Sequence, residues 1–333
     1  MLRISVVMDS EIRITTKTIL TAVLVVFGTW LAIRLRVILL VLFASLILAL
    51  GLTPLVDWLT KRRIPRGLAV SLVTIFLSLL FVGLGAVGIS PLIDQTQRLV
   101  QRLPQFLEAL AESPNAPEFL RGFNQALVEQ LSNVSRNILR ATWGAFSGAL
   151  TIISILFLTF YLLLDLENFK RLLLSFLSRV NHAAAKDIIE EIETKLGVWL
   201  RTQALLMVIV GMMTFLGLWL LGVDYALPLA LISGLLEMIP TLGPIIAAIP
   251  ALIVGFANSS LTGLGVLALA ILVQQLENNL IVPKLMQKAV GFNPLVTMII
   301  ILVGGELFGL LGVLISIPAA LVASILAKRF LKI

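Results

Sequence analysis

Long apolar runs separated by short polar segments dominate this chain. The runs cover residues 19–33, 37–58, 67–89, 145–164, 203–222, 225–256, 261–279 and 291–327. Most of them approach or exceed the roughly 17 to 25 residues that a helix needs to cross a bilayer. None alternates strictly between apolar and polar positions, as a barrel strand would. The pattern therefore predicts an all-α, polytopic helical membrane protein.

The polar segments divide the chain into five parts. Residues 1–90 hold three N-terminal spans, 91–144 a polar insertion, 145–164 a fourth span, 165–202 a second polar segment and 203–333 a C-terminal core. In both polar segments apolar residues recur at helical spacing, which predicts amphipathic helices. For the insertion, a role in packing or oligomer contact is favoured over a binding site. Because only residues 34–36 separate the first two apolar runs, we expect those runs to form a tight hairpin.

The distribution of basic residues predicts the orientation. Residues 61–66 read Lys-Arg-Arg-Ile-Pro-Arg, and a short basic loop between spans marks the cytoplasmic side. The insertion at 91–144 is then extracytoplasmic, residues 165–202 lie along the cytoplasmic surface, and both termini are cytoplasmic.

Composition narrows the function. Hydrophobic residues make up 59% and charged residues 13% of the chain, against roughly 25% charged residues in a soluble domain. The net charge of +7 lies in loops between spans, which argues against nucleic acid as a partner. The chain has no cysteine and a single histidine, His182 in a polar connector, so we expect no metal site. It has neither a phosphate-binding GxxxxGK[ST] loop nor a catalytic set within its spans, so we expect no ATP-driven pump, no enzyme and no cofactor.

One apolar run contains a polar break. Residues 237–244 read Glu-Met-Ile-Pro-Thr-Leu-Gly-Pro in the middle of the run 225–256. In hydrocarbon an unpaired carboxylate or backbone group costs several kcal/mol, so such a break is tolerated only where it is buried in protein or lines a wet cavity. A weak repeat follows, in which Glu306, like Glu237, precedes a glycine at plus six and then an Ile-Pro-Ala triplet.

The apolar arms before the two glutamates are too short to cross a membrane. As helices, residues 225–238 extend about 21 Å and residues 294–304 about 16 Å, against a hydrocarbon core of roughly 30 Å. Two re-entrant hairpins, near 225–256 and 294–327, would resolve this, the first entering from outside and the second from the cytoplasm. Opposed half-helices of this kind form the binding sites of secondary transporters. The alternative is that both glutamates are interfacial residues at the ends of ordinary short helices.

The predicted substrate or ion site combines both hairpin tips with the polar end of the span between them. It comprises Glu237, Pro240, Thr241, Gly243, Pro244, Gln274, Gln275, Glu277, Asn278, Asn279, Gly304, Gly305, Glu306 and Gly309. Carboxylates in a shared, poorly hydrated cavity do not all stay ionised, so one of them can carry a coupled proton. Amides offer donors and acceptors to hydroxyl groups, whereas a cation would bind the carboxylate oxygens. For Glu277 the alternative is a structural ion pair with Lys284.

These segments resemble the signature blocks of the autoinducer-2 exporter family of bacterial permeases. The main blocks are residues 237–244, 275–284, 304–312 and 317–318, and weaker ones are residues 54–66 and 200–203. The resemblance covers nearly the whole chain in the right order. It implies about eight membrane segments in the bacterial inner membrane and a homo-oligomer, a pentamer by family analogy, that works by alternating access or an elevator-like motion.

For function, the resemblance implies a secondary exporter of a small polar, autoinducer-2-like solute, with coupling to a proton or sodium gradient. One alternative is sodium or other cation/proton antiport, and a second is a channel or membrane scaffold. The expected partners are membrane lipid and a small polar solute or cation. The first hairpin departs from this expectation, because it offers few polar residues beyond Glu237 and Thr241 to a polyhydroxylated ligand.

Overall fold

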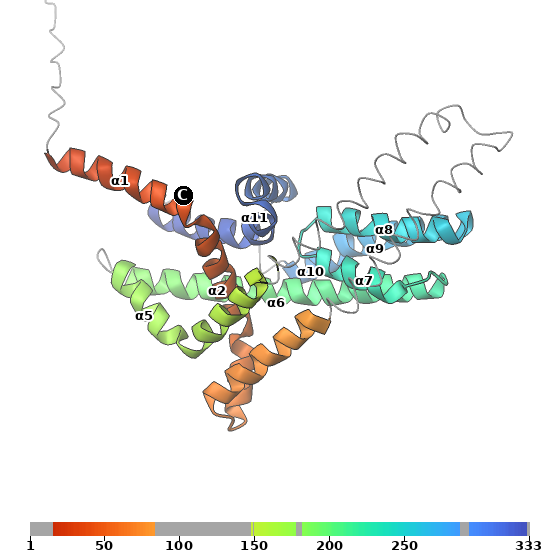
Figure 1. Cartoon of the computed structure of the whole chain (residues 1–333), viewed down its shortest axis with the longest axis horizontal. Coiled ribbons are helices and arrows are strands. Elements are labelled where there is room, and N and C mark those ends of the chain that lie inside the picture. Colours follow the sequence, from red (N-terminus) through yellow and green to blue (C-terminus); the bar gives the residue numbers. More distant parts are fainter. Residues whose placement is uncertain (1–15, 84–147, 149, 178–181, 287–292, 332–333) are drawn as a thin grey trace, which may run out of the picture.

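The computed structural model describes residues 16–83, 148, 150–177, 182–286 and 293–331, which form helices joined by short connections (Figure 1). Five helices within these ranges are long and apolar enough to cross a membrane, and the bent pair Leu150–Leu164 and Leu166–Ser175 adds a sixth. The prediction of an all-α, polytopic membrane protein is confirmed. The predicted insertion at 91–144 lies outside the described residues.

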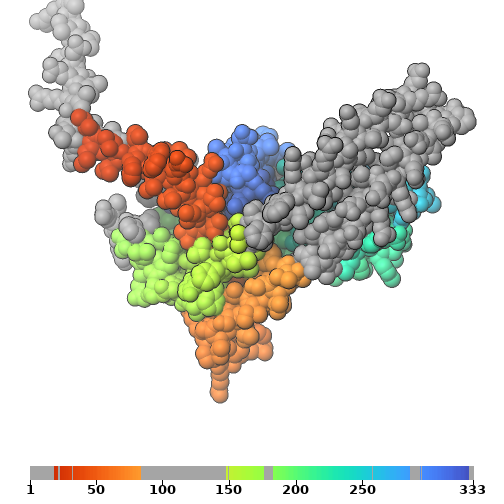
Figure 2. Space-filling view, viewed as in Figure 1, coloured from red at the N-terminus to blue at the C-terminus, as the bar shows by residue number. Residues whose placement is uncertain are grey.

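The first two helices are joined end to end. α1 (Thr16–Arg34) and α2 (Arg36–Lys61) meet at Leu35, whose amide donates to the Leu31 carbonyl at 2.8 Å. The Leu39 amide donates to the Leu35 carbonyl at 2.9 Å, so helical hydrogen bonding continues through the junction. The predicted tight hairpin is therefore wrong, because Arg34 and Arg36 do not interrupt the backbone hydrogen bonds of the helix. The described apolar side chains of α1 are exposed, and the helix projects from the body as an arm (Figure 2).

α2 packs against helix Arg66–Gly83 and helix Leu150–Leu164 around a common core. Its buried members are Ala49, Val56, Ala69, Val70, Val73, Leu162 and Leu163. Two hydroxyl groups add polar contacts: Ser45 Oγ donates to the Ile155 carbonyl at 3.2 Å, and Thr159 Oγ1 donates to the Ser45 carbonyl at 3.3 Å. Because each hydroxyl has an acceptor, the polar groups are accommodated in an otherwise apolar interface.

The chain bends by 83° after Leu164, where α5 (Leu166–Leu177) begins. Arg66 Nη2 donates to the Leu163 carbonyl at 3.1 Å. This contact satisfies one of the acceptors that a helix end leaves unpaired.

α6 (His182–Leu220) is a single long helix. Its N-terminal half is tied to α5 through Lys170, which pairs with Glu193 at 2.8 Å and with Glu167 at 3.1 Å. The helix passes residue 202, the expected boundary of the polar segment, without a break. One element therefore joins a charged region to an apolar one.

The first hairpin consists of α7 (Ala226–Leu236), a turn over residues 237–241, and α8 (Leu242–Asn258). α7 lies along α6, and α8 lies along α9 (Ser260–Leu276) (Figure 1). The approach of α7 to α6 is close: a Cβ atom on Gly234 would lie 2.7 Å from the Met207 carbonyl oxygen. Small residues at this crossing let the two backbones touch.

α11 (Pro294–Leu331) forms the second hairpin. A straight helix of its 38 residues would be about 57 Å long. Instead, Gly309 adopts φ 63° and ψ −148°, and Gly304 lies against Gly312 and Ser316. In a straight helix Gly304 and Gly312 would be about 12 Å apart along the axis, so residues 294–308 and 310–331 are two limbs that fold back on each other.

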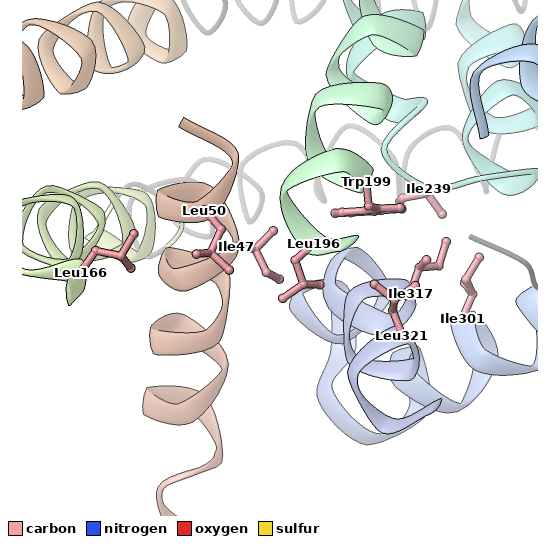
Figure 3. Close-up of a cluster of buried hydrophobic side chains, with 9 residues drawn as sticks. All are labelled: Ile47, Leu50, Leu166, Leu196, Trp199, Ile239, Ile301, Ile317 and Leu321. Carbon is pink, nitrogen blue, oxygen red and sulfur yellow. The ribbon is translucent and has the colours of Figure 1, made fainter. Parts of the chain in front are cut away.

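The two hairpins meet at the centre of the molecule, in a cluster of buried apolar side chains from α2, α5, α6, the first turn and α11. The cluster contains Ile47, Leu50, Leu166, Leu196, Trp199, Ile239, Ile301, Ile317 and Leu321. In Figure 3, Ile239 from the tip of the first hairpin lies beside Trp199 and faces Ile301 and Ile317 of the second. This packing fixes the tip of the first hairpin in the protein interior.

Candidate functional site

The tip of the first hairpin has a strained backbone. Thr241 adopts φ 71° and ψ −49°, and the Leu242 amide donates to the Pro240 carbonyl at 2.8 Å across it. This is a γ-turn of the rare type with a positive φ. A β-branched residue in that region is an outlier, and such strain, of order 1–3 kcal/mol, persists only where the surrounding structure enforces it.

Gly243 follows the turn at a point where a side chain has no room. A Cβ atom there would overlap the Leu236 carbonyl oxygen at the end of α7. Its amide donates to the Ile239 carbonyl at 2.8 Å, which closes the tip. The Gly-Pro pair at 243–244 thus lets α8 start directly against the end of α7, and it turns the chain back within five residues.

Glu237 and Glu277 form a buried pair of carboxyl groups. Glu237 is the first residue after α7, and only 2% of it is exposed; Glu277 follows α9, and 4% of it is exposed. Their side chains lie within hydrogen-bonding range of each other. The four ion pairs among the described residues all lie on α5 and α6, so no lysine or arginine in that part of the chain neutralises the pair. The alternative ion pair of Glu277 with Lys284 is not among them.

Glu277 also begins a π-helical turn. η1 (Glu277–Ile281) separates α9 from α10 (Val282–Met286). A π-turn is rare and is frequently found at functional sites, because the extra residue widens the helix and redirects side chains. Here it places a carboxyl group in the interior, although the residues on either side of it in the sequence are polar or partly exposed.

Gln203 on α6 completes the buried group, although it is not among the residues of the predicted site. Its side chain is 1% exposed, and its Nε2 donates to the backbone carbonyl of Glu237 at 2.6 Å. The available signal was an amide in the apolar half of a helix, where a polar group needs a partner. Periodicity could not identify that partner, which lies 34 residues later in the chain.

The polar residues at the end of α9 divide between two places. Gln274 Nε2 lies 3.3 Å from Glu277 Oε2, so this amide adjoins the carboxyl pair, and it lies equally far from Oδ1 of Asn278, whose side chain is exposed. Gln275 and Asn279 are exposed and hydrogen-bond to each other at 2.8 Å. Of the four amides that the sequence pattern grouped in one site, the structure therefore brings Gln274 to the carboxyl pair.

The second hairpin does not bring its glutamate to the pair. The Glu306 side chain is exposed and forms no hydrogen bond or ion pair with any other described residue. Gly304 faces the other limb, and Glu306, two residues further on, points about 200° away around the helix. Gly305 approaches Val313, and Gly309 forms the tip with open space around it. The expectation of three carboxylates in one cavity is therefore not met within the described chain.

Cavities border the first hairpin, and two of them are lined mainly by apolar side chains. One of about 350 Å³ lies between α6, α7, α8 and α9, with Gln274, Thr214 and Ser233 as its polar lining. The other, of about 450 Å³, lies where Leu235 and Met238 of the first hairpin approach Leu310 and Leu314 of the second. Neither offers the several hydrogen-bonding groups that usually orient a polar ligand.

Comparison with known proteins connects this geometry to transport. The sequence profile of AI-2E family transporters matches residues 19–332, a range that includes both hairpins. The chain is similar to two Bacillus subtilis proteins, YrrI and YueF, whose names describe them as transport proteins. YrrI is 27% identical over 318 residues, which cover 91% of this chain and 89% of YrrI. YueF is 29% identical over 282 residues, which cover 78% and 75%. A Haemophilus influenzae protein with the same kind of name is 29% identical over 296 residues, covering 84% of this chain and 83% of its own length.

Proposed function

The chain belongs to the AI-2E family of transporters, and on that premise we propose that it is a secondary transporter whose coupling ion binds at the Glu237–Glu277 pair. The observation that carries the proposal is the contact between two buried carboxyl groups that have no described cationic partner. Such a pair is stable only when it shares a proton or holds a cation, since two adjacent carboxylates repel each other and burial removes their hydration.

The hairpin geometry supports movement of the site between the two sides of the membrane. α7 has 11 residues and α8 has 17, about 16 and 26 Å of helix. Both are shorter than the roughly 30 Å hydrocarbon core, so the first hairpin enters the membrane and returns without crossing it. The glutamate at its tip then lies where an alternating-access or elevator-like motion exposes it to each side in turn.

The transported solute in this proposal is small and polar, as the family resemblance implies, and autoinducer-2 represents its chemical class. The chain sits in the bacterial inner membrane as a homo-oligomer with both termini in the cytoplasm. A basic loop at Lys61 to Arg66, exposed apart from Ile64, supports this orientation.

Cation/proton antiport is a second candidate, and the cavities favour it. Because the space beside the hairpins is mainly apolar, it provides few partners for a polyhydroxylated solute, whereas a proton or sodium ion needs only the carboxyl pair and its amides. In this version the pair is the whole substrate site, and proton and cation compete for it.

Flux measurements in proteoliposomes test both versions. Purified protein is reconstituted, and a proton or sodium gradient is imposed while ²²Na⁺ uptake, internal pH and uptake of labelled autoinducer-2 are followed. Gradient-driven uptake of autoinducer-2 supports the exporter, and sodium flux coupled to opposite proton flux supports the antiporter. Flux that ignores both gradients would indicate a channel, and the absence of any flux would indicate a scaffold. Gradient-driven flux that is unchanged by Glu237→Gln and by Glu277→Gln would falsify the assignment of the coupling site.

A further inference from the structure

Gln203 is held in one orientation at the carboxyl pair. Its Nε2 lies 2.6 Å from the Glu237 backbone oxygen, which can only accept a hydrogen bond. The amide therefore cannot be turned around without losing this bond. Since Nε2 and Oε1 belong to the same planar group, the side-chain oxygen Oε1 also lies next to the tip of the first hairpin.

Two oxygens at this place accept no hydrogen bond from an amide, hydroxyl or cationic group among the described residues. They are Gln203 Oε1 and Glu237 Oε2, and both belong to side chains that are at least 98% buried. Leaving a buried acceptor unpaired is unfavourable, so native structures pair such groups or use them to bind something. Glu277 adds a third side chain with oxygen atoms to the same site.

We propose that Gln203 is a direct ligand of a monovalent metal cation of sodium size, which binds between Gln203 Oε1, Glu237 Oε2 and the Glu277 carboxyl group. The inference rests on the proposed function, because it names the coupling ion and adds a ligand from α6. Each of the three elements that meet here, α6, the tip of the first hairpin and the end of α9, contributes one oxygen-bearing side chain.

Charge and hydration favour a monovalent ion over the usual divalent ones. A calcium site provides six to eight oxygen ligands, and Mg²⁺ gives up its water reluctantly. Three side chains buried to 96% or more offer at most five oxygens, fewer than a calcium site provides. If the two carboxyl groups share one proton, a single negative charge remains, and one monovalent cation neutralises it.

The amide also connects the ion to the hairpin. One end of Gln203 holds the backbone of the tip and the other end holds the ion, so occupancy of the site stabilises the tip against α6. Release of the ion removes the polar contacts that it makes among the three elements and leaves the Nε2 hydrogen bond and the apolar packing of Ile239 to hold the tip. In this way the cation controls the movement that the proposed function requires.

Sodium binding to the full-length protein in detergent, measured by titration calorimetry with sodium chloride, tests the inference. Gln203→Met removes both ends of the amide at similar length. Gln203→Glu removes the Nε2 donor but keeps an oxygen. Both variants lose the hydrogen bond to the tip, so a merely structural role predicts that they behave alike. We expect Gln203→Met to weaken sodium binding by about tenfold or more, and Gln203→Glu to bind sodium at least as tightly as the original chain.

Thr214→Val serves as a matched control. Thr214 and Ser233 form a polar contact of 3.2 Å between the same two helices, α6 and α7, and Thr214 lies about three turns along α6 from Gln203. This variant should leave the sodium dissociation constant unchanged even if it lowers the unfolding temperature. The unfolding temperature of every variant, measured with and without sodium, separates loss of a ligand from loss of the fold.

The outcomes separate this inference from the function on which it rests. Equal weakening in Gln203→Met and Gln203→Glu, or no weakening in either, overturns the role of Gln203 as a ligand. If no sodium binds, yet Glu237→Gln abolishes proton-driven flux, the sodium inference fails and the coupling site stands. If Glu237→Gln changes neither flux nor sodium binding, the proposed function itself fails.

Discussion

The two hairpins share a sequence pattern but place their glutamates in opposite environments. In the first hairpin Glu237 lies just beyond the last turn of α7, where it faces α6 and α9 and is 2% exposed. In the second hairpin Glu306 lies inside a helical limb, three residues before the tip, and is exposed. Glu237 keeps helical backbone angles, φ −57° and ψ −18°, so the helical period directs both glutamates, and the difference lies in which face of each hairpin other helices cover. The repeat in sequence is therefore not a repeat in side-chain environment.

The largest expected difference between the hairpins is in transport. Glu237→Gln or Glu277→Gln should reduce gradient-driven flux by about 100-fold or more, because a neutral amide can neither take up the coupled proton nor neutralise a cation. Glu306→Gln should leave flux within about twofold, as expected for an exposed side chain without partners. Parallel flux assays on proteoliposomes with matched protein content check this. Equal losses for Glu306→Gln and Glu237→Gln would show that both hairpins supply the site, for example across a subunit boundary.

The second prediction concerns how the second hairpin folds. A side chain on Gly312 would overlap the Gly304 carbonyl oxygen, whereas Gly309 has open space around it and requires only a positive φ. Gly312→Leu should therefore lower the free energy of unfolding by about 3 kcal/mol through overpacking. Gly309→Ala should lower it by only about 1 kcal/mol through backbone strain. Thermal unfolding in detergent measures both. A milder effect of Gly312→Leu than of Gly309→Ala would mean that the limbs are not folded together at these glycines.

The third prediction concerns the strain that distinguishes the tip of the first hairpin. Because Thr241 has φ 71° without being glycine, Thr241→Gly should raise the stability of the folded state by about 1 kcal/mol, partly offset by the greater entropy of the unfolded chain. The unfolding temperature should rise by a few degrees at most. Thr241→Ala keeps a Cβ atom and is the matched comparison, with no such gain. A lower unfolding temperature for Thr241→Gly would indicate that the threonine side chain, not the backbone, holds the turn.

The smallest expected effect comes from the amide beside the carboxyl pair. Gln274→Leu removes a long hydrogen bond to Glu277 of 3.3 Å, so the half-saturating ion concentration should rise about threefold, with the maximal flux little changed. Ion titrations in the flux assay measure both quantities. A loss of maximal flux with unchanged half-saturation would place Gln274 in the movement of the hairpin instead of in the binding of the ion.

Several features of the fold could be predicted from the local sequence pattern, because a membrane strongly limits which backbone structures can span it. A run of about twenty apolar residues must be helical in hydrocarbon, so the all-α class could be predicted. Helical arms of eleven to fourteen residues are too short to cross the bilayer, so breaks were predicted at residues 237–244 and 304–312. The structure has a turn at 237–241 and a hairpin tip at Gly309, close to both predictions. The hairpin predicted near Leu35 was wrong. The charged residues there indicated a break between two helices, but the helical hydrogen bonds continue through them.

By itself the sequence determined that this is a polytopic helical membrane protein of a transporter family, with polar, glycine- and proline-broken segments inside its apolar core. Only the tertiary structure decided which of three glutamates meet. It brought Glu237 and Glu277 together with Gln203, from three separate elements, and turned Glu306 away. The reason is physical: spacing along one helix sets the direction of a side chain relative to its own axis, but the partner it finds depends on how distant helices pack.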